Sequence, residues 1–256
     1  MSLAFDVFVV EPKPIPSAVP GFEEATWPPS TSTLISGDGG GLLVDCLITE
    51  QEGRELAAWV SSHEGELRYV YITHPHADHF LALPEILAAF PDAEPVALAE
   101  SIPAMEEQIS PGYMQVWGQF FPGQLTSKPV APAPLAGTAI PLGGSAATLI
   151  PVGTSDTGHS SVVHVPSLSL VVSGDVVYNQ THMWLQGSTP DSRASWARAL
   201  DTVAALDART IIAGHRSRDS RYGKHTEPQN LLHRSHYFIP SGGDLRSFTR
   251  RCVFTT

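Results

Sequence analysis

The chain has 256 residues, of which 42% are hydrophobic and 16% are charged, a balance that excludes a disordered protein and supports one large core or two small ones. Its formal net charge of −11, from 26 acidic and 15 basic residues, opposes binding to nucleic acid and to anionic membranes. Two distant cysteines, Cys46 and Cys252, exclude a disulfide framework, and no apolar run approaches the length of a membrane span.

Apolar periodicity and turn residues divide the first half of the chain into short strands and helices. Residues 122–137 are proline-rich and irregular, which is typical of a surface excursion or an active-site lid. The predicted elements, in chain order, are strand 5–10, loop 17–30, a hairpin from 33–35 to 42–45, helix 49–62, strand 68–72, helix 80–90, strand 95–98 and a broken helical segment over 99–120.

The second half starts again with strands and ends in helices. Ser192 or Asp191 is the expected N-cap of its first helix. Two packed βα halves in a single domain over residues 1–240 follow from this order, and the aperiodic segment 241–256 predicts a poorly ordered tail. The predicted elements are strands 138–141, 146–152, 161–165 and 168–172, helix 192–206, strand 209–213 and a last helix around 227–238.

A dense group of metal-ligand residue types lies between strand 68–72 and helix 80–90. Three histidines and one aspartate, His74, His76, Asp78 and His79, fall within six residues. Imidazole and carboxylate are the ligands that suit zinc and similar metals. In an extended loop, residues two apart point the same way, so His74 and His76 can bind one metal. Asp78 and His79, at the turn into the helix, can reach a second.

Two metals need further ligands, and the ends of three later strands supply candidates. His159 precedes a strand in the segment Asp156-Thr157-Gly158-His159, Asp175 follows a strand after Gly174, and His215 follows a strand after Gly214. A glycine before each candidate allows the backbone to approach closely.

This HxHxDH motif, followed in order by a later His, Asp and His, resembles the motif set of the metallo-β-lactamase superfamily from about residue 5 to residue 240. The resemblance implies an α/β (α+β) fold, a four-layer αβ/βα sandwich with metals at the edge between its sheets. Matched by position, His74, His76 and His159 resemble the ligands of a first zinc ion, and Asp78, His79 and His215 those of a second. Asp175 resembles the bridging carboxylate, and Asp45 the early aspartate that supports the histidine loop.

The resemblance also bears on the metal. Diiron flavoproteins of the superfamily have glutamate where this chain has His76, which favours two Zn²⁺ per chain over a redox iron pair. Iron or manganese stays possible, because related hydrolases and persulfide dioxygenases share the motif. Zinc lowers the pKa of its bound water to near neutrality, so a metal-bound hydroxide is the expected nucleophile. Asp78 is expected to orient it and to transfer a proton.

The sequence therefore predicts a binuclear zinc hydrolase acting on a small, neutral or apolar ester, lactone, thioester or amide. An iron-dependent sulfur (persulfide) dioxygenase or a glyoxalase II-like thioesterase is the alternative, and a protein that binds without turnover is a third class. Tyr178 and His182 are candidates for binding substrate, and Trp117, with Phe120 and Met114, forms either an apolar wall over the metals or helix core. A small-molecule substrate is the expected partner, with no nucleic acid and no membrane, and the oligomeric state stays open. Residues 1–16 show no signal-peptide pattern, so we expect a cytoplasmic location.

Overall fold

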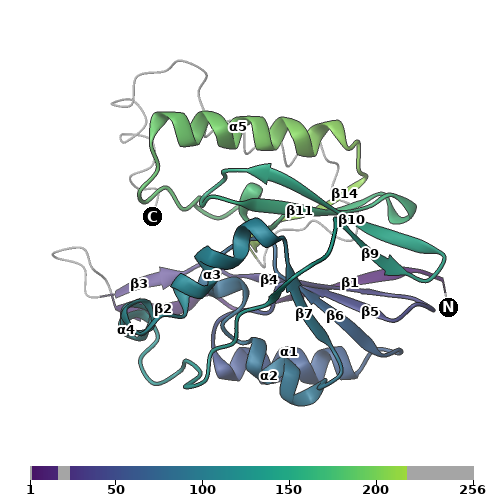
Figure 1. Ribbon diagram of the computed structural model, residues 1–256. Helices are drawn as coiled ribbons and strands as arrows, with labels where there is room; N and C mark the ends of the chain where they lie inside the picture. The colour runs from purple at the N-terminus through teal and green to yellow at the C-terminus, as the bar shows by residue number, and fades with distance from the viewer. Residues whose placement is uncertain (1, 17–23, 218–256) are drawn as a thin grey trace.

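The computed structural model describes residues 2–16 and 24–217. Two β-sheets face each other, and helices cover the outer face of each (Figure 1). This helix–sheet–sheet–helix order confirms the predicted four-layer sandwich. The predicted helix at 227–238 and the tail at 241–256 lie outside the described residues.

The first sheet has six strands in the order β1-β4-β5-β6-β7-β8. Strands β5, β6 and β7 run parallel to one another, so their carboxyl ends meet at one edge of the sheet. Asp45 follows β5 at this edge, and the histidine loop follows β6. The strands are β1 (Ala4–Val9), β4 (Thr31–Ser36), β5 (Gly41–Val44), β6 (Leu67–Tyr71), β7 (Glu94–Ala97) and β8 (Ala133–Pro134).

The second sheet has five strands in the order β14-β12-β11-β10-β9. Strands β12 and β14 are parallel, which brings Asp175, after β12, beside His215, after β14. A short parallel pair, β13 (Tyr178–Asn179) and β15 (His215–Arg216), holds the following segments together. The strands are β9 (Ala139–Leu142), β10 (Ser145–Gly153), β11 (Ser160–Val165), β12 (Leu170–Val172) and β14 (Thr210–Ile212).

The helices begin where capping and proline chemistry allow. The predicted helix at 80–90 starts late, as α2 (Leu83–Ala89), because Pro84 is tolerated only in a first helical turn. A short 3₁₀ turn, η1 (Ala77–His79), precedes it. Helix α5 (Pro190–Ala205) is capped by Thr189 and not by Ser192 or Asp191, because Pro190 takes the first helical position and keeps its predecessor extended. The remaining helices are α1 (Glu50–Ser61), α3 (Ile102–Gln108) and α4 (Pro111–Phe120).

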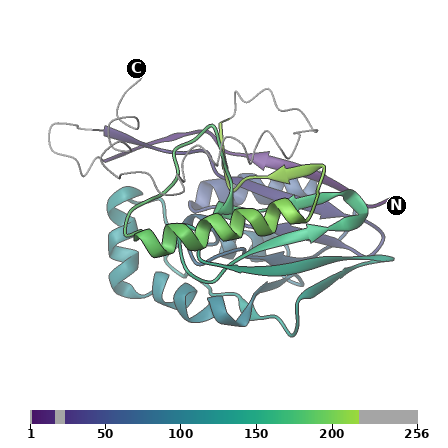
Figure 2. The same ribbon diagram turned by 90° about the horizontal axis from the view of Figure 1, so that it is seen from above.

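The prediction that residues 17–30 form a loop is wrong for residues 24–27, which form a strand. Strand β2 (Lys13–Pro16) pairs with β3 (Glu24–Trp27) as an antiparallel hairpin. Its prolines stand at every second position, which leaves Lys13 and Ile15 free to donate to β3. The Lys13 ammonium contacts the Glu52 carboxylate of α1 and lies 6.0 Å from the centre of the Phe121 ring. These contacts attach the base of the hairpin to α1 and to the end of α4, and Figure 2 shows hairpin and α4 at the same end of the sandwich.

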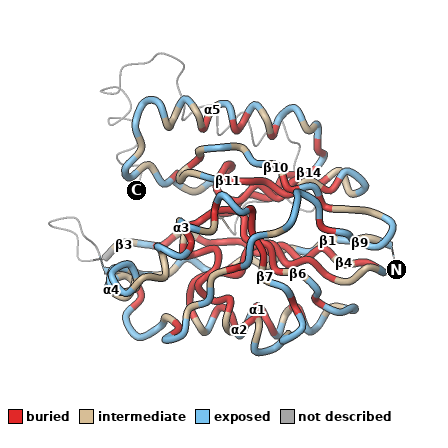
Figure 3. Tube along the Cα trace, viewed as in Figure 1, coloured by how far each residue is buried: buried red, intermediate tan, exposed pale blue. Residues whose placement is uncertain are grey.

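Three apolar layers hold the sandwich together. Figure 3 shows that buried residues concentrate in the strands and on the inner sides of the helices. One layer lies between the first sheet and α1 and α2, one between the two sheets, and one between the second sheet and α5. A fourth, smaller cluster joins Trp27 of the hairpin to α4. Among the described residues, no helix is long and apolar enough to cross a membrane.

Candidate metal centre

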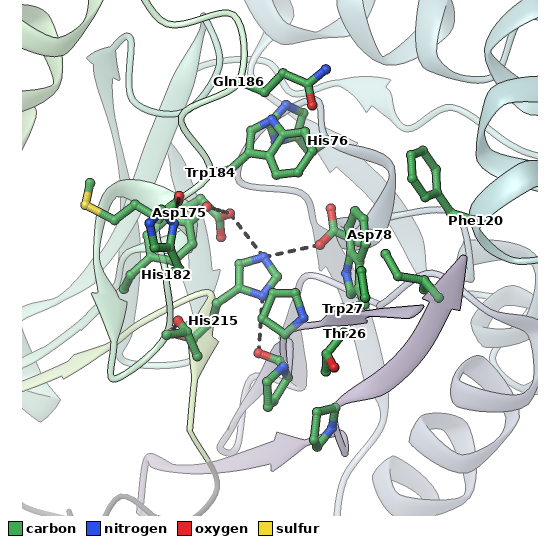
Figure 4. Close-up of a pocket in the computed structure, with 18 of the residues that line it drawn as sticks. Thr26, Trp27, His76, Asp78, Phe120, Asp175, His182, Trp184, Gln186 and His215 are labelled. Carbon is green, nitrogen blue, oxygen red and sulfur yellow. Dashed lines mark hydrogen bonds and ion pairs between the residues drawn. The ribbon is translucent and has the colours of Figure 1, made fainter. Parts of the chain in front are cut away.

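Ligand-type side chains from both sheets meet at one edge of the sandwich. The loop after β6 brings the histidine cluster, and the ends of β12 and β14 bring Asp175 and His215. Figure 4 shows His76, Asp78, Asp175 and His215 facing a common space. All but His76 are buried, and His76 is partly exposed toward a cavity. The parallel strand ends therefore assemble residues that are up to 141 positions apart, from His74 to His215.

The first group comprises His74, His76, Asp156 and Asp175, whose donor atoms all lie within 4.8 Å of one another. The Asp156 Oδ2 atom lies 2.6 Å from His76 Nδ1 and 3.7 Å from His74 Nε2. The Asp156 carboxylate is completely buried. This group contains two imidazoles and two carboxylates.

The second group comprises Asp78, His79 and His215. Asp78 Oδ2 lies 3.2 Å from His215 Nε2 and 3.9 Å from His79 Nε2. Asp175 reaches this group too, with Oδ1 3.2 Å from His79 Nε2 and Oδ2 3.2 Å from His215 Nε2. Asp175 therefore stands between the two groups, which is the position expected for the bridging carboxylate that it resembles.

The structure does not bring His159 into either group, contrary to the expectation that it completes the first. Its side chain is exposed, its φ is +59°, and its carbonyl accepts a hydrogen bond of 2.8 Å from Ser101 Oγ. Asp156 turns inward instead, while its Oδ1 accepts from Ser155 Oγ and the Thr157 amide. The segment 153–160 forms an irregular turn, and the left-handed backbone at His159 directs that side chain away. Motif order suggested histidine; the turn geometry selects aspartate.

Asp45 lies behind the histidine loop and fixes it by several hydrogen bonds. It accepts from the Thr73 amide at 2.8 Å, from the Thr73 hydroxyl, and from His79 Nδ1 at 2.9 Å. Its own φ is +60°, a conformation that aspartate tolerates better than most residues. Thr73 Oγ1 in turn lies 3.0 Å from His74 Nδ1.

A common tautomer follows for three of the histidines. The Nδ1 atoms of His74, His79 and His215 face acceptors outside the cluster, that of His215 being the Pro29 carbonyl at 3.2 Å. Each can carry its proton on Nδ1 and present the Nε2 lone pair inward, which is the arrangement that orients metal-ligating histidines.

The Tyr178 hydroxyl belongs to the hydrogen-bond network that holds the ligand side chains, so it is not free to bind substrate. The Tyr178 hydroxyl donates a short hydrogen bond to Asp175 Oδ2, and its ring stacks on His215 with centroids 5.3 Å apart. The side chain is buried. Tyr178 therefore positions the carboxylate shared by both groups.

Replacing Tyr178 by phenylalanine is expected to weaken metal binding by about 10- to 100-fold, because the ring stays while the hydrogen bond that orients Asp175 is lost. A titration against a competing chelator measures the change. Tyr71→Phe is the matched control, since its hydroxyl contacts Ser161 and not a ligand. Equal metal affinity in both variants would show that the Tyr178 hydroxyl has no such role.

The buried charges shift one another's protonation. Burial by itself lowers the pKa of His79, but the carboxylates of Asp175, Asp45 and Asp78 raise it well above its usual value. For His215 burial is likewise outweighed, chiefly by Asp175, and its pKa rises to about 10. The pKa values of Asp78 and Asp175 fall despite their burial, because charged histidines surround them. Burial and His79 lower the pKa of His74.

The donor atoms fit metal ions better than they fit one another. Five buried atoms make no aligned hydrogen bond: His74 Nε2, Asp78 Oδ2, His79 Nε2, Asp156 Oδ2 and Asp175 Oδ1. The nitrogen–oxygen distances around the second group are 3.2 to 3.9 Å. Ligands at ~2.1 Å around a tetrahedral zinc are about 3.4 Å apart. Burying five polar atoms without an aligned hydrogen bond is costly, and metal ions bound by them would offset that cost.

Metal binding to the metal-free protein is expected to release about one to two protons near pH 7.5, because His79 and His215 must lose theirs to offer Nε2. Metal affinity should therefore rise from pH 6 toward pH 10. The stability of the metal-free fold depends on pH in the opposite direction. The stabilisation that comes from the raised His215 pKa is complete below about pH 6.5 and is lost as the pH approaches 10. Calorimetry in buffers of different ionisation enthalpy counts the protons, and identical heats in all buffers would contradict the prediction.

A cavity of about 1060 Å³ opens onto the cluster. His76, Asp78, Asp175 and His215 form part of its lining. Trp117, Tyr178 and His182, the three substrate-binding candidates, line it as well. Met114, Trp117 and Phe120 all pack against the small core around Trp27, and of these three only Met114 does not reach the cavity. Motif analysis missed Trp27 and Trp184, which line the cavity from the β2–β3 hairpin and from the segment after β13.

Comparisons with known proteins identify the family and the fold. The family profile of the metallo-beta-lactamase superfamily matches residues 25–215, a range that includes every residue of both groups. A search of curated proteins finds no match. Among solved structures, a metallo-beta-lactamase from Pontibacter korlensis aligns with a TM-score of 0.64 at 18% identity, covering 93% of this chain and 100% of that chain.

Two further structures align over similar lengths. A metallo-beta-lactamase from Hirschia baltica has a TM-score of 0.59 at 16% identity, covering 92% of this chain and 96% of its own. TMB-1 has a TM-score of 0.59 at 17% identity, covering 91% and 98%. Such identities establish the fold, and the profile match establishes the family. The chain belongs to the metallo-β-lactamase superfamily, whose fold and ligand cluster make it a metal-dependent hydrolase.

Proposed function

We propose that the protein is a binuclear zinc hydrolase that cleaves a small-molecule ester, lactone, thioester or amide. One observation supports this most: two groups of ligand atoms share Asp175 at the floor of a cavity large enough for a substrate. The first ion would be held by His74, His76 and Asp156, and the second by Asp78, His79 and His215.

The chain's own residues supply positioning and proton transfer. Bound zinc would polarise the carbonyl and make water nucleophilic near neutral pH. Asp78 lines the cavity, so its carboxylate is placed to accept a hydrogen bond from the attacking water and to receive its proton as the bond is cleaved. Tyr178 and Asp45 hold Asp175 and His79 at fixed angles. Because these contacts exist before substrate binds, little reorganisation is needed during the reaction.

An iron-dependent sulfur dioxygenase is the second candidate, and Asp156 is the observation that favours it. His74, His76 and Asp156 make two histidines and one carboxylate, a set found at non-haem iron sites with open positions. The hydrolase remains the first choice because a second group of ligands lies beside these three residues. It consists of Asp78, His79 and His215. A glyoxalase II-like thioesterase needs the same two groups and differs from the proposed hydrolase only in substrate.

We propose a neutral small molecule as the partner, with no role for nucleic acid or membrane. The net charge of −11 supports this choice by repelling polyanions. A cytoplasmic location remains a prediction.

Metal analysis and a substrate panel test the proposed function together. Two zinc ions per purified chain and hydrolysis of at least one aryl ester, lactone or thioester are expected. Asp78→Ala should reduce turnover by about 10²- to 10⁴-fold, the range of general acid–base catalysis. Asp92→Ala, at an exposed residue that belongs to neither group, is the matched control and should not change it. One iron per chain with oxygen consumption on a persulfide would establish the alternative.

A further inference from the structure

We propose that the substrate carries a large, neutral, apolar group next to the bond that is cleaved, and that an aromatic wall of Trp27, Trp117, Phe120 and Trp184 binds it. This inference rests on the proposed function for the cleaved bond, but the binding part of it stands separately. The wall lines the same cavity as His76 and Asp78, so a group that it binds lies in the space that the metal ligands border.

Three distant segments build this wall. Trp27 comes from β3, Trp117 and Phe120 from α4, and Trp184 from the segment after β13. The Trp27 ring lies 6.0 Å from Trp117 and 6.2 Å from both Phe120 and Trp184. Figure 4 shows Trp27, Phe120 and Trp184 around the space that His76, Asp78 and His215 face. Aromatic rings in such contact offer a broad apolar surface.

Part of the wall is rigid before any ligand binds. Trp117 Nε1 donates a hydrogen bond of 3.0 Å to Gln108 Oε1. Trp27 is buried and packs edge-on against Phe121, with ring centroids 5.2 Å apart. A preformed surface loses little conformational entropy on binding, so its apolar area converts efficiently into affinity.

The exposed apolar side chains gather at the same cavity. In the part of the chain that the structure describes, four large hydrophobic side chains are exposed: Tyr113 at 39%, Val116 at 46%, Val130 at 37% and Trp184 at 39%. All of these except Val130 line the cavity. Single exposed apolar residues are ordinary, but their concentration at one opening marks a binding surface.

The charge of the lining favours a neutral occupant. Within residues 2–16 and 24–217, no lysine or arginine lines the cavity. Its polar lining away from the ligands includes one carboxylate, that of Glu11, which also disfavours an anion, and is otherwise mostly uncharged, with Gln108, Gln180, Gln186, Thr26 and Thr181. A substrate carboxylate would lose its hydration there without gaining a cationic partner from these residues. A cavity of about 1060 Å³ also has room for a benzyl or octanoyl group.

A homologous series of p-nitrophenyl esters, from acetate to octanoate, tests the proposal on zinc-loaded protein. We expect kcat/KM to rise about three- to fourfold per added methylene over part of the series, as expected for burial of each group. Trp184→Ala and Trp117→Ala should each flatten this slope. Val130→Ala removes an equally exposed apolar side chain outside the cavity, and should leave the slope unchanged.

Three acyl groups of similar shape test which charge the cavity accepts in a substrate. The neutral 4,4-dimethylpentanoyl group is compared with analogues whose chains end in a carboxylate and in a trimethylammonium. We expect kcat/KM to be at least tenfold higher for the neutral ester than for either charged one. A carboxylate ester that matches or exceeds it would overturn the proposal, and so would a preferred ammonium ester, which would indicate a cation-binding cage.

Ketone analogues, which cannot be hydrolysed, separate this proposal from the proposed function. If no ester is cleaved, binding of phenyl alkyl ketones to the metal-free protein is followed by tryptophan fluorescence. Affinity that rises with chain length and falls in Trp117→Ala would uphold the aromatic wall while the hydrolase proposal fails. Affinity independent of chain length, or equal for a carboxylate-bearing ketone, would overturn the wall itself.

Discussion

Asp156→Ala is expected to lower the metal content from two ions per chain to one, whereas His159→Ala leaves it at two. Asp156 Oδ2 is the buried atom that faces His76 at 2.6 Å and His74 at 3.7 Å, while His159 is exposed. Removing the carboxylate leaves two imidazoles and the shared Asp175, so affinity of the first group should fall by more than about 100-fold. Elemental analysis after dialysis measures the content.

The pair of variants is matched, because both residues lie in one loop and neither belongs to the apolar core. Cobalt substitution adds a second readout: its visible spectrum reports ligand type and should change in Asp156→Ala alone. Loss of one ion in His159→Ala, with none lost in Asp156→Ala, would restore the assignment that motif order suggested.

Asp175→Asn is expected to remove both metal ions and to abolish turnover. The substitution keeps the size of the side chain and removes its charge. Both groups depend on Asp175, since its oxygens lie 3.2 Å from His79 Nε2 and from His215 Nε2 and it also belongs to the first group. A carboxylate between two metals offsets their mutual repulsion, which an amide cannot do.

Gly214→Ala offers an independent route to the same defect. A Cβ at Gly214 would lie 2.1 Å from Asp175 Oδ1 and 2.7 Å from the Gly174 carbonyl carbon, so the carboxylate and the backbone beside it must move while the carboxylate's chemistry is retained. Both variants should lose both ions in elemental analysis, and circular dichroism checks that they fold. Retention of one ion in Asp175→Asn would show that the two groups bind separately.

Much of the candidate site could be predicted from local sequence. His74, His76, Asp78 and His79 lie within six residues at a strand end, where backbone alternation alone sets which side chains share a direction. Asp45, Asp175 and His215 each follow a predicted strand, and parallel strands end at one edge. Spacing and topology were therefore sufficient to bring these residues together.

The wrong predictions concern features that depend on backbone conformation or on long-range packing. The segment 153–160 contains Asp156 and His159, and which of them turns inward depends on positive φ angles at Gly153 and His159 that spacing does not reveal. The predicted loop 17–30 contains β3, whose partner β2 went unnoticed because prolines usually end strands, but in a two-stranded ribbon alternate positions need no donor. The N-cap of α5 moved to Thr189 because Pro190 occupies the first helical position.

By itself the sequence indicated the family and most residues of the two candidate ligand groups, because these depend on short motifs, and it indicated the strands and helices by their periodicity. The four-layer sandwich followed from the resemblance to the family. The tertiary structure decided that Asp156 takes the place expected for His159, and that Tyr178 serves Asp175. It also decided that Trp27, Trp117 and Trp184 form one wall, although 157 positions separate the first from the last. Contacts between such distant residues follow from how the hairpin, α4 and the second sheet pack against one another, which no local pattern encodes.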